Sequence, residues 1–321
     1  MSELRISILR REAHGMALSA YVTALEARLP DHDIRLARTQ AKEREAVATS
    51  EVVTGFVLDE ELLAHADEMK LFACGYAGVG HLPLDMLREK QIAVTNASGV
   101  HGPNIGEYVV GAILSFVRRF PEAWRRSNRK EWRHFRVHEL QGSTVTVVGL
   151  GALGTAVVDR LHPFGVETIG VRYSPEKGGP TDEVVGLTDA DAFDDALSRT
   201  DYLVLTCPLT DETRGLLGPE EFTTVPATAV LVNVARGPVV ETDALVDALR
   251  GNQLRGAALD VTDPEPLPED HPLWSLGNVM ITPHNAGHTP QYYERLAEIL
   301  AENVRQIEAT GEYEELRNQV L

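Results

Sequence analysis

Short apolar runs alternate with helix-like stretches along most of this chain, and that alternation restricts its fold more than any other feature of the sequence. A short continuous apolar run is typical of a strand that is buried on both faces. In the first third of the chain such runs cover 4–9, 52–56, 71–74 and 92–95, with helix-like stretches at 16–28 and 60–66. Strands that alternate with helices in this way form parallel sheets, so the sequence predicts an α/β fold.

A second series of apolar runs follows at 144–148, 167–171, 202–206, 229–232, 257–261 and 279–281. Two longer helix-like segments bracket this series, one from about 104 to 119 and one from about 290 to 309. The 321 residues are enough for about two domains. The sequence therefore predicts two doubly wound parallel-sheet domains, with residues 101–289 inserted into a domain formed by 1–100 and 290–321.

The charge of the chain is strongly acidic, with 48 acidic against 30 basic residues and a net charge of −18. Because nucleic acids are dense polyanions, this balance argues against a nucleic-acid partner. Only five of the basic residues are lysines. Concentrated salt screens the self-repulsion of such a surface, so the composition predicts a halophilic protein.

The sequence offers little for a disulfide framework or a membrane anchor. The two cysteines, Cys74 and Cys207, fall in different expected domains, which favours a reduced, cytoplasmic location. The longest membrane-like stretch, 108–117, is far shorter than the roughly 20 residues that span a bilayer. We therefore expect no membrane partner.

A glycine-rich turn follows the first strand of the second series. Gly149, Gly151 and Gly154 form G-x-G-x-x-G between the apolar run 144–148 and the helix-like stretch 152–161. In that context glycine lets a pyrophosphate approach the backbone, while the helix N-terminus supplies N–H groups and partial positive charge. The turn predicts a dinucleotide site, and the alternative is a tight turn in an unrelated strand–helix unit.

The next strand ends at Arg172, where an NAD site usually places Asp or Glu for the ribose hydroxyls. A guanidinium cannot accept those hydrogen bonds, but it matches a 2′-phosphate, and Ser174 and Lys177 offer further donors. This favours NADP(H), with NAD(H) as the second cofactor. In the alternative interpretation Arg172 stacks on the adenine or points to solvent.

Four further segments, 206–215, 233–241, 259–266 and 282–289, accompany the glycine turn. In order and spacing they resemble the D-2-hydroxyacid dehydrogenase family over residues 70 to 300. The acidic composition and Arg172 are similar to an NADP-preferring, haloarchaeal-like member. The resemblance implies a Rossmann-type coenzyme domain inserted into a flavodoxin-like substrate domain, and a homodimer.

The resemblance also implies roles for individual residues. Arg236 matches the substrate-binding arginine, and Glu265 and His284 match the acid–base pair. The expected substrate-binding residues are Tyr76, Ala77, Gly78, Arg236 and His284, although many relatives have Asp at the place of Gly80. The expected cofactor-binding residues are Gly149, Gly151, Ala152, Leu153, Gly154, Arg172, Tyr173, Ser174, Cys207, Pro208, Thr213, Val234, Ala235, Arg236, Asp260, His284 and Gly287.

The chemistry of these residue types suits a small 2-oxo or 2-hydroxy acid as substrate. Reduction of a 2-oxo acid needs a hydride from the nicotinamide and a proton on the carbonyl oxygen. A histidine can give or take that proton near neutral pH, and a neighbouring carboxylate orients its ring. The planar fork of Arg236 can hold the carboxylate and polarise the carbonyl. We therefore predict an enzyme that reversibly reduces 2-oxo acids to D-2-hydroxy acids.

Two other interpretations are compatible with parts of the sequence. A dinucleotide-binding, corepressor-like protein of the same fold would bind the cofactor without turnover. The i,i+4 spacing of His284 and His288 is compatible with a metal site, but the intervening Asn-Ala-Gly favours a loop and supplies no glutamate base, so we predict no metal.

Overall fold

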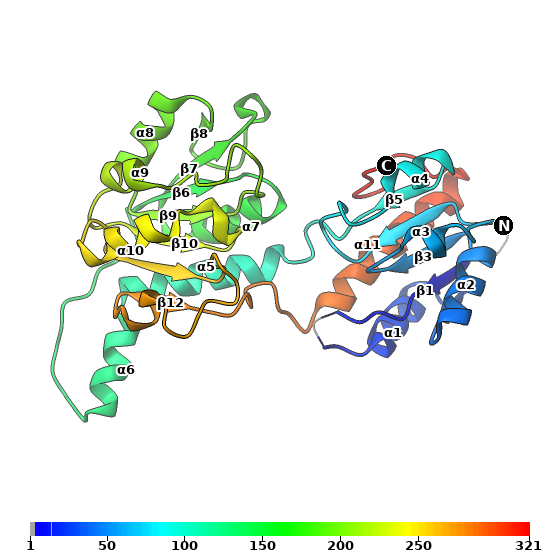
Figure 1. Ribbon diagram of the computed structural model, residues 1–321, viewed down its shortest axis with the longest axis horizontal. Helices are drawn as coiled ribbons and strands as arrows, with labels where there is room; N and C mark the ends of the chain where they lie inside the picture. Colours follow the sequence, from blue (N-terminus) through cyan, green and yellow to red (C-terminus); the bar gives the residue numbers. More distant parts are fainter. Residues whose placement is uncertain (1–3, 14) are drawn as a thin grey trace. The chain divides into compact units, whose positions relative to one another are not determined.

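The computed structural model describes residues 4–13 and 15–321. The chain divides into two compact units, Met1–Val100 with His288–Leu321 and the continuous stretch His101–Gly287 (Figure 1). We call them the split unit and the inserted unit. The sequence placed the second boundary between residues 289 and 290, close to the division at Gly287 and His288.

The split unit contains a five-stranded parallel sheet in the order β2-β1-β3-β4-β5. Its strands are β1 (Arg5–Ile8), β2 (Asp33–Leu36), β3 (Val52–Gly55), β4 (Leu71–Cys74) and β5 (Ala93–Thr95). Its helices are α1 (Leu18–Arg28), α2 (Gln40–Thr49), α3 (Glu60–Leu63), α4 (Leu84–Glu89) and α11 (Tyr292–Thr310). This strand order is that of a flavodoxin-like fold, as the sequence predicted.

Both faces of this sheet are buried, because successive side chains along a strand point to opposite faces. In β3, Val52 packs with α1 and α11, whereas Val53 packs with α2, α3 and α4. The sequence missed β2 because this edge strand, Asp-Ile-Arg-Leu, is half exposed and carries no continuous apolar run.

The inserted unit contains a seven-stranded parallel sheet in the order β12-β11-β10-β9-β6-β7-β8. Its strands are β6 (Thr144–Val148), β7 (Glu167–Arg172), β8 (Glu183–Gly186), β9 (Tyr202–Leu205), β10 (Val230–Asn233), β11 (Gly256–Leu259) and β12 (Val279–Ile281). The α-helices are α5 (Gly102–Val117), α6 (Phe120–Asn128), α7 (Ala152–Leu161), α8 (Ala190–Ser198), α9 (Pro219–Thr224) and α10 (Thr242–Arg250). Short 3-10 turns are η1 (His162–Phe164), η2 (Pro175–Lys177), η3 (Gly237–Val239) and η4 (Pro272–Ser275).

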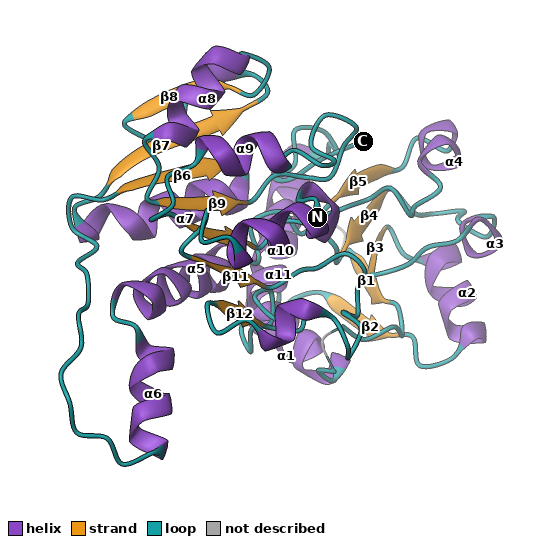
Figure 2. Ribbon diagram, turned by 60° about the vertical axis from the view of Figure 1, so that its left-hand side comes forward, coloured by secondary structure: helices purple, strands orange, loops and turns teal. Residues whose placement is uncertain are grey.

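The strand order of the inserted unit confirms the Rossmann-type prediction. From central β6 the chain builds outward through β7 and β8, then returns to the other side of β6 and builds through β9 to β12. Helices α5 and α7 pack on one face of the sheet, and α8, α9 and α10 pack on the other (Figure 2). Ligands of such sheets bind outside the carboxyl ends of the strands, where the order reverses. The sequence did not predict the edge strand β8, because only the second half of this strand is well buried.

The glycine turn lies at that reversal point, between β6 and α7. Gly149 has a φ of +100°, and a Cβ there would lie 2.6 Å from the Cα of Cys207. A Cβ on Gly154 would lie 2.0 Å from the carbonyl oxygen of Gly149. A Cβ on Gly151, in contrast, would meet no atom within 4 Å. The outer two glycines are therefore needed by the packing of the chain itself, whereas the middle one faces open space.

Helix α7 begins at this open space without a side-chain cap and without an acidic residue in its first turn. The first N–H groups of a helix have no partner inside the helix and carry partial positive charge. The N-terminus of α7 is thus prepared for an anionic group. Elsewhere in the described chain, no helix is long and apolar enough to cross a bilayer.

Two alanine substitutions separate folding from cofactor binding at this turn. We expect Gly154→Ala to lower the free energy of unfolding by about 1–3 kcal/mol, because its Cβ collides with backbone. We expect Gly151→Ala to leave unfolding within about 0.5 kcal/mol of the parent but to weaken NADPH binding at least about tenfold. Urea unfolding and a fluorescence titration with NADPH measure the two effects. Undiminished NADPH binding by Gly151→Ala contradicts the assignment of the turn.

Candidate active site

The three residues expected to be catalytic follow the carboxyl ends of neighbouring strands. Strands β10, β11 and β12 pair in parallel, so their carboxyl ends lie at the same edge of the sheet. Arg236 follows β10, Glu265 follows β11 and His284 follows β12. All three therefore belong to the inserted unit, and its topology brings them to one edge.

Arg236 is exposed, and its backbone is fixed by a buried amide. The side chain of Asn233, at the end of β10, accepts from the Ala235 N–H at 3.0 Å and donates to the Arg236 carbonyl at 3.2 Å. The Arg236 guanidinium donates to the Ala235 carbonyl at 2.7 Å. Within residues 4–13 and 15–321 no carboxylate pairs with it. The rest of its donor fork is therefore available to an anion.

The loop that carries Arg236 lies directly against the loop that carries Glu265. A Cβ on Gly237 would lie 1.9 Å from the carbonyl oxygen of Thr262, so only glycine allows this approach. The hydroxyl of Thr242, at the start of α10, donates to the carbonyl of Asp263 at 2.9 Å. These two contacts fix the Glu265 segment beside the Arg236 loop.

His284 and Glu265 form the central contact of the site. Nδ1 of His284 lies 2.9 Å from Oε1 of Glu265, and the two side chains are 50% and 40% exposed. An ionised carboxylate can only accept, so Nδ1 carries the hydrogen of this bond. Nε2 has no hydrogen-bond partner in the part of the chain that the structure describes. The ring is thus oriented through one nitrogen, and the other is open to a further partner.

Asp260 is buried, and its carboxylate is used by the loop that holds His284. Oδ1 accepts from the hydroxyl of Thr282 at 2.5 Å and from the N–H of Asn285 at 2.8 Å. Oδ2 accepts from the N–H of Ala286 at 2.9 Å. The structure therefore gives Asp260 a loop-holding place that the sequence did not predict. Its expected role in cofactor binding stays a prediction.

A cavity of about 550 Å³ lies next to the glycine turn. The expected cofactor residues that line it are Gly149, Gly151, Arg172, Tyr173, Ser174, Cys207, Pro208 and Thr213. Lining residues outside the expected cofactor set are Val148, Leu150, Val171, Lys177, Leu187, Thr210 and Glu212. Expected cofactor residues that do not line it are Ala152, Leu153, Gly154, Val234, Ala235, Arg236, Asp260, His284 and Gly287. Val148, Leu150 and Val171 each directly neighbour a residue that the sequence singled out, so these three could have been found from their positions.

The cavity suits a nucleotide that carries a phosphate. One guanidinium nitrogen of Arg172 donates to the carbonyl of Gly178, which holds the side chain over the loop that follows β7. Neither Arg172 nor Lys177 pairs with a carboxylate among the described residues. The lining includes one carboxylate, Glu212, whose pKa a hydrogen bond from Thr210 lowers. The residues present fit a dinucleotide, with two cations available to a 2′-phosphate.

Two residues that line the cavity, Cys207 and Thr213, serve as parts of its wall and carry no reactive group. Burial raises the pKa of the Cys207 thiol to about 11, so it stays protonated and is a poor nucleophile. The hydroxyl of Thr213 donates to the carbonyl of Pro208 at 2.6 Å and accepts from the N–H of Thr210 at 2.8 Å. These bonds close the turn 208–213 on itself.

The expected substrate loop after β4 belongs to the split unit. The Tyr76 ring is partly exposed and packs edge-on against His81, with ring centroids 5.5 Å apart. The side chain of Asn96 donates to the carbonyl of Ala77 at 2.7 Å, and a Cβ on Gly78 would meet no atom within 4 Å. The hydrogen bond from Asn96 holds the loop at Ala77, and the space next to Gly78 is free of other atoms. Its role toward a substrate stays a prediction.

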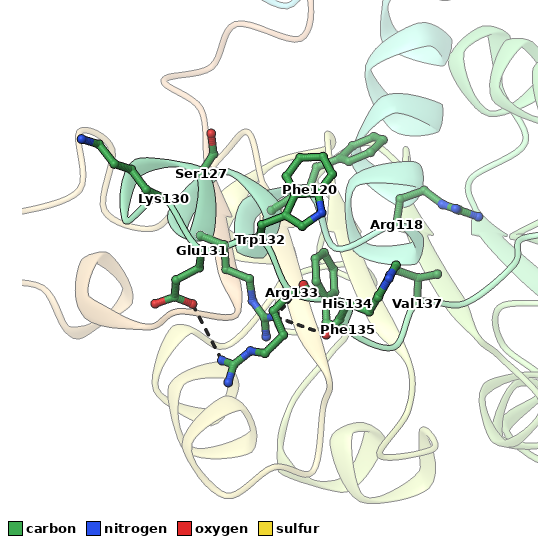
Figure 3. A pocket seen from close by; sticks show the side chains of 12 residues that line it. Arg118, Phe120, Ser127, Lys130, Glu131, Trp132, Arg133, His134, Phe135 and Val137 are labelled. Carbon is green, nitrogen blue, oxygen red and sulfur yellow. Dashed lines mark hydrogen bonds and ion pairs between the residues drawn. The ribbon is translucent and has the colours of Figure 1, made fainter.

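A second cavity, of about 630 Å³, involves none of the expected site residues (Figure 3). It lies in the stretch 118–138, which we call the arm and which contains α6 and the loop after it. The arm carries eight arginine or lysine residues against two glutamates. Within it, Arg126 donates to Glu122 at 2.5 Å and stacks over the Phe135 ring at 4.7 Å. Among the described residues no group of three or more His, Cys, Asp or Glu side chains could hold a metal.

Comparison with known proteins gives consistent results. The family model of the D-isomer specific 2-hydroxyacid dehydrogenase NAD binding domain matches residues 110–286. A glyoxylate reductase from Thermofilum pendens is 36% identical over 77% of this chain and 74% of its own length. The D-3-phosphoglycerate dehydrogenase of Methanocaldococcus jannaschii is 33% identical over 80% of this chain. That match covers 49% of the length of the relative, so this chain spans about half of it.

A solved structure of similar fold covers the whole chain. It is a D-isomer specific 2-hydroxyacid dehydrogenase from Xanthobacter autotrophicus Py2 in complex with NADPH and MES. The two chains are 27% identical with a TM-score of 0.78, and the match covers 100% of this chain and 98% of the other. The family model, the sequence relatives and the fold therefore agree, and the chain belongs to the D-2-hydroxyacid dehydrogenase family of oxidoreductases, which use a nicotinamide cofactor.

Proposed function

We propose that this protein reversibly reduces small 2-oxo acids to D-2-hydroxy acids with NADPH as its preferred cofactor. The observation that carries this proposal is the 2.9 Å contact between His284 Nδ1 and Glu265, at the same sheet edge as Arg236, whose guanidinium pairs with no carboxylate among the described residues. Relatives named glyoxylate reductase and glyoxylate reductase/hydroxypyruvate reductase support short 2-oxo acids as the substrate class.

Each of the three side chains has one task in this reaction. Arg236 binds the carboxylate of the substrate through its free donors and polarises the carbonyl oxygen. His284 gives a proton to that oxygen from Nε2, and Glu265 holds the ring through Nδ1 and stabilises the charge that the ring carries. The cofactor, when bound, supplies the hydride for the carbonyl carbon. The backbone N–H groups of Ala77 and Gly78 are further candidates for binding the carboxylate.

The preference for NADPH rests on the two cations that line the nucleotide cavity. Arg172 and Lys177 have no carboxylate partner among the described residues, and both line the cavity beside the glycine turn. A 2′-phosphate matches them, whereas the two ribose hydroxyls of NADH call for an acceptor.

Replacing the proton donor is the sharpest test of the activity. We expect the parent protein to turn over at least one of glyoxylate, hydroxypyruvate, pyruvate and branched 2-oxo acids with NADPH. His284→Ala should lower kcat about 10²–10⁴-fold, because general acid catalysis is lost, and should weaken NADPH binding far less than it lowers kcat. Steady-state kinetics and a fluorescence titration measure the two quantities. His162→Ala, which removes an exposed histidine of the same unit, is the control.

Two results contradict this proposal. Turnover by His284→Ala near that of the parent removes the histidine from the mechanism. A parent protein that binds NADPH tightly but reduces none of the acids favours a corepressor-like member of the fold.

The cofactor preference has its own test. We expect Arg172→Asp to shift the ratio of kcat/KM for NADPH over NADH at least about tenfold towards NADH, because a carboxylate repels the 2′-phosphate and accepts from the ribose hydroxyls. Arg250→Asp, at the exposed end of α10, makes the same charge change away from the cavity and should leave the ratio unchanged. An unchanged ratio for Arg172→Asp refutes the assignment.

We also propose that two copies of the chain pair through the arm. Trp132 is fully exposed and Trp124 is 62% exposed, both within the cationic arm of a chain whose net charge is −18. Exposed aromatic residues among arginines are typical of protein interfaces. The acidic remainder of a second copy is complementary in charge. Halophilic behaviour stays a prediction from composition alone.

Sedimentation equilibrium tests the pairing. The parent should sediment at about twice the chain mass of 35.2 kDa. The double variant Trp124→Ala/Trp132→Ala should shift to the monomer mass, because the interface loses its aromatic anchors. Trp274→Ala removes another tryptophan that is 53% exposed, outside the arm, and should remain paired. A parent that sediments at the monomer mass overturns the pairing.

A further inference from the structure

Helix α5 holds the loop of His284 at both ends. We define the His284 loop as residues 282–286. Asn104 and Tyr108 are four residues apart on α5 and so share one face of the helix. The Asn104 amide donates to the carbonyl of Ala286 at 2.7 Å, and the Tyr108 hydroxyl lies 2.7 Å from the hydroxyl oxygen of Thr282. His284 is at the centre of the segment between these two contacts.

The direction of the bond between Tyr108 and Thr282 follows from the next bond in the chain. The Thr282 hydroxyl donates its single hydrogen to Asp260 Oδ1 at 2.5 Å. Tyr108 must therefore be the donor to Thr282. Burial raises the pKa of Tyr108 to about 12, so its phenol keeps this hydrogen throughout the neutral range. The result is a one-way series of donors from Tyr108 through Thr282 to the buried carboxylate of Asp260.

The His284 loop needs this support because its centre is strained and exposed. His284 has a φ of +52°, a left-handed conformation that few residues other than glycine adopt without cost. Its side chain is 50% exposed, so core packing does little to fix the ring. The position of the ring is set by its contact with Glu265 and by the bonds that hold the loop backbone. The His284 N–H donates to the Asp260 carbonyl at 2.8 Å, and the Asp260 carboxylate binds the flanking segment.

We propose that Tyr108 is a positioning residue for His284, acting through Thr282 and Asp260 to hold Nε2 of the histidine where it transfers its proton. This inference rests on the proposed function, since it takes His284 as the proton donor. Tyr108 touches neither substrate nor cofactor in this role. It fixes the loop geometry on which the transfer depends, because small displacements of an acid from its acceptor slow a reaction strongly.

The test removes single hydroxyl groups from the intact protein. Tyr108→Phe keeps the ring and loses the donor. Thr282→Val keeps the shape and loses the link to Asp260, whereas Thr282→Ser keeps the link. Tyr202→Phe is the matched control, because Tyr202 is a buried tyrosine of the same unit whose hydroxyl binds Arg255 at 3.0 Å, away from the loop.

The readouts are chosen to separate positioning from general stability. We expect Tyr108→Phe and Thr282→Val to lower kcat about 10- to 100-fold, with the Kd for NADPH within about twofold of the parent. The solvent deuterium isotope effect on kcat should rise, because proton transfer becomes more limiting. Amide hydrogen exchange in 282–286 should become faster, and the melting temperature should match that of Tyr202→Phe. Thr282→Ser should restore kcat to within about threefold.

Each other outcome counts against the proposal. A kcat of Tyr108→Phe within twofold of the parent overturns it, even if exchange in the loop is faster. A kcat that falls only as far as the folded fraction falls assigns Tyr108 a structural role. If the parent reduces no 2-oxo acid, the proposed function fails first. In that case unchanged exchange in 282–286 after Tyr108→Phe separately overturns the coupling of Tyr108 to the loop.

Discussion

Parallel pairing of β10, β11 and β12 is the constraint on which the site depends. Because these strands run in one direction, the loops after them emerge at one edge of the sheet, and residues far apart in sequence meet there. The close approach of Gly237 to the Thr262 carbonyl then brings two of these loops into backbone contact. The third loop is joined to the second by the bond from the His284 N–H to the Asp260 carbonyl. The loops that carry the three side chains are therefore connected to one another through their backbone.

The fold was largely predictable because its central strands are buried on both faces. Such strands read as continuous apolar runs, and a run at β6 followed by a glycine turn indicates a nucleotide-binding unit. The sequence did not predict strands β2 and β8, because neither is buried on both faces. They lie at sheet edges, where partial exposure permits polar residues and removes the apolar run. Sequence patterns therefore describe the middle of each sheet better than its borders.

The site was predictable only in part. Resemblance to a family predicted Arg236, Glu265 and His284 as catalytic residues, and all three follow strands whose carboxyl ends lie at one edge of the inserted unit's sheet. Their catalytic roles stay predictions. The resemblance did not predict the contact between Tyr108 and Thr282. A single tyrosine in an apolar helix is usually interpreted as a residue of the hydrophobic core. Their contact joins positions that are 174 residues apart, which no local spacing rule can detect. The expected place of Asp260 near the cofactor stays a prediction. Its buried carboxylate also holds a loop, and only the three-dimensional arrangement of N–H groups shows that contact.

The inserted unit begins and ends at neighbouring points. A Cβ on Gly287 would lie 3.7 Å from the ring of His101, and the Asn104 amide binds the Ala286 carbonyl. One uninterrupted stretch of gene thus encodes a complete Rossmann-type sheet with both ends fastened together. Such a segment can be inserted into another protein at one position of its chain, because the first and last residues of the segment lie close together. Both junctions of this segment lie outside the strands of the two sheets.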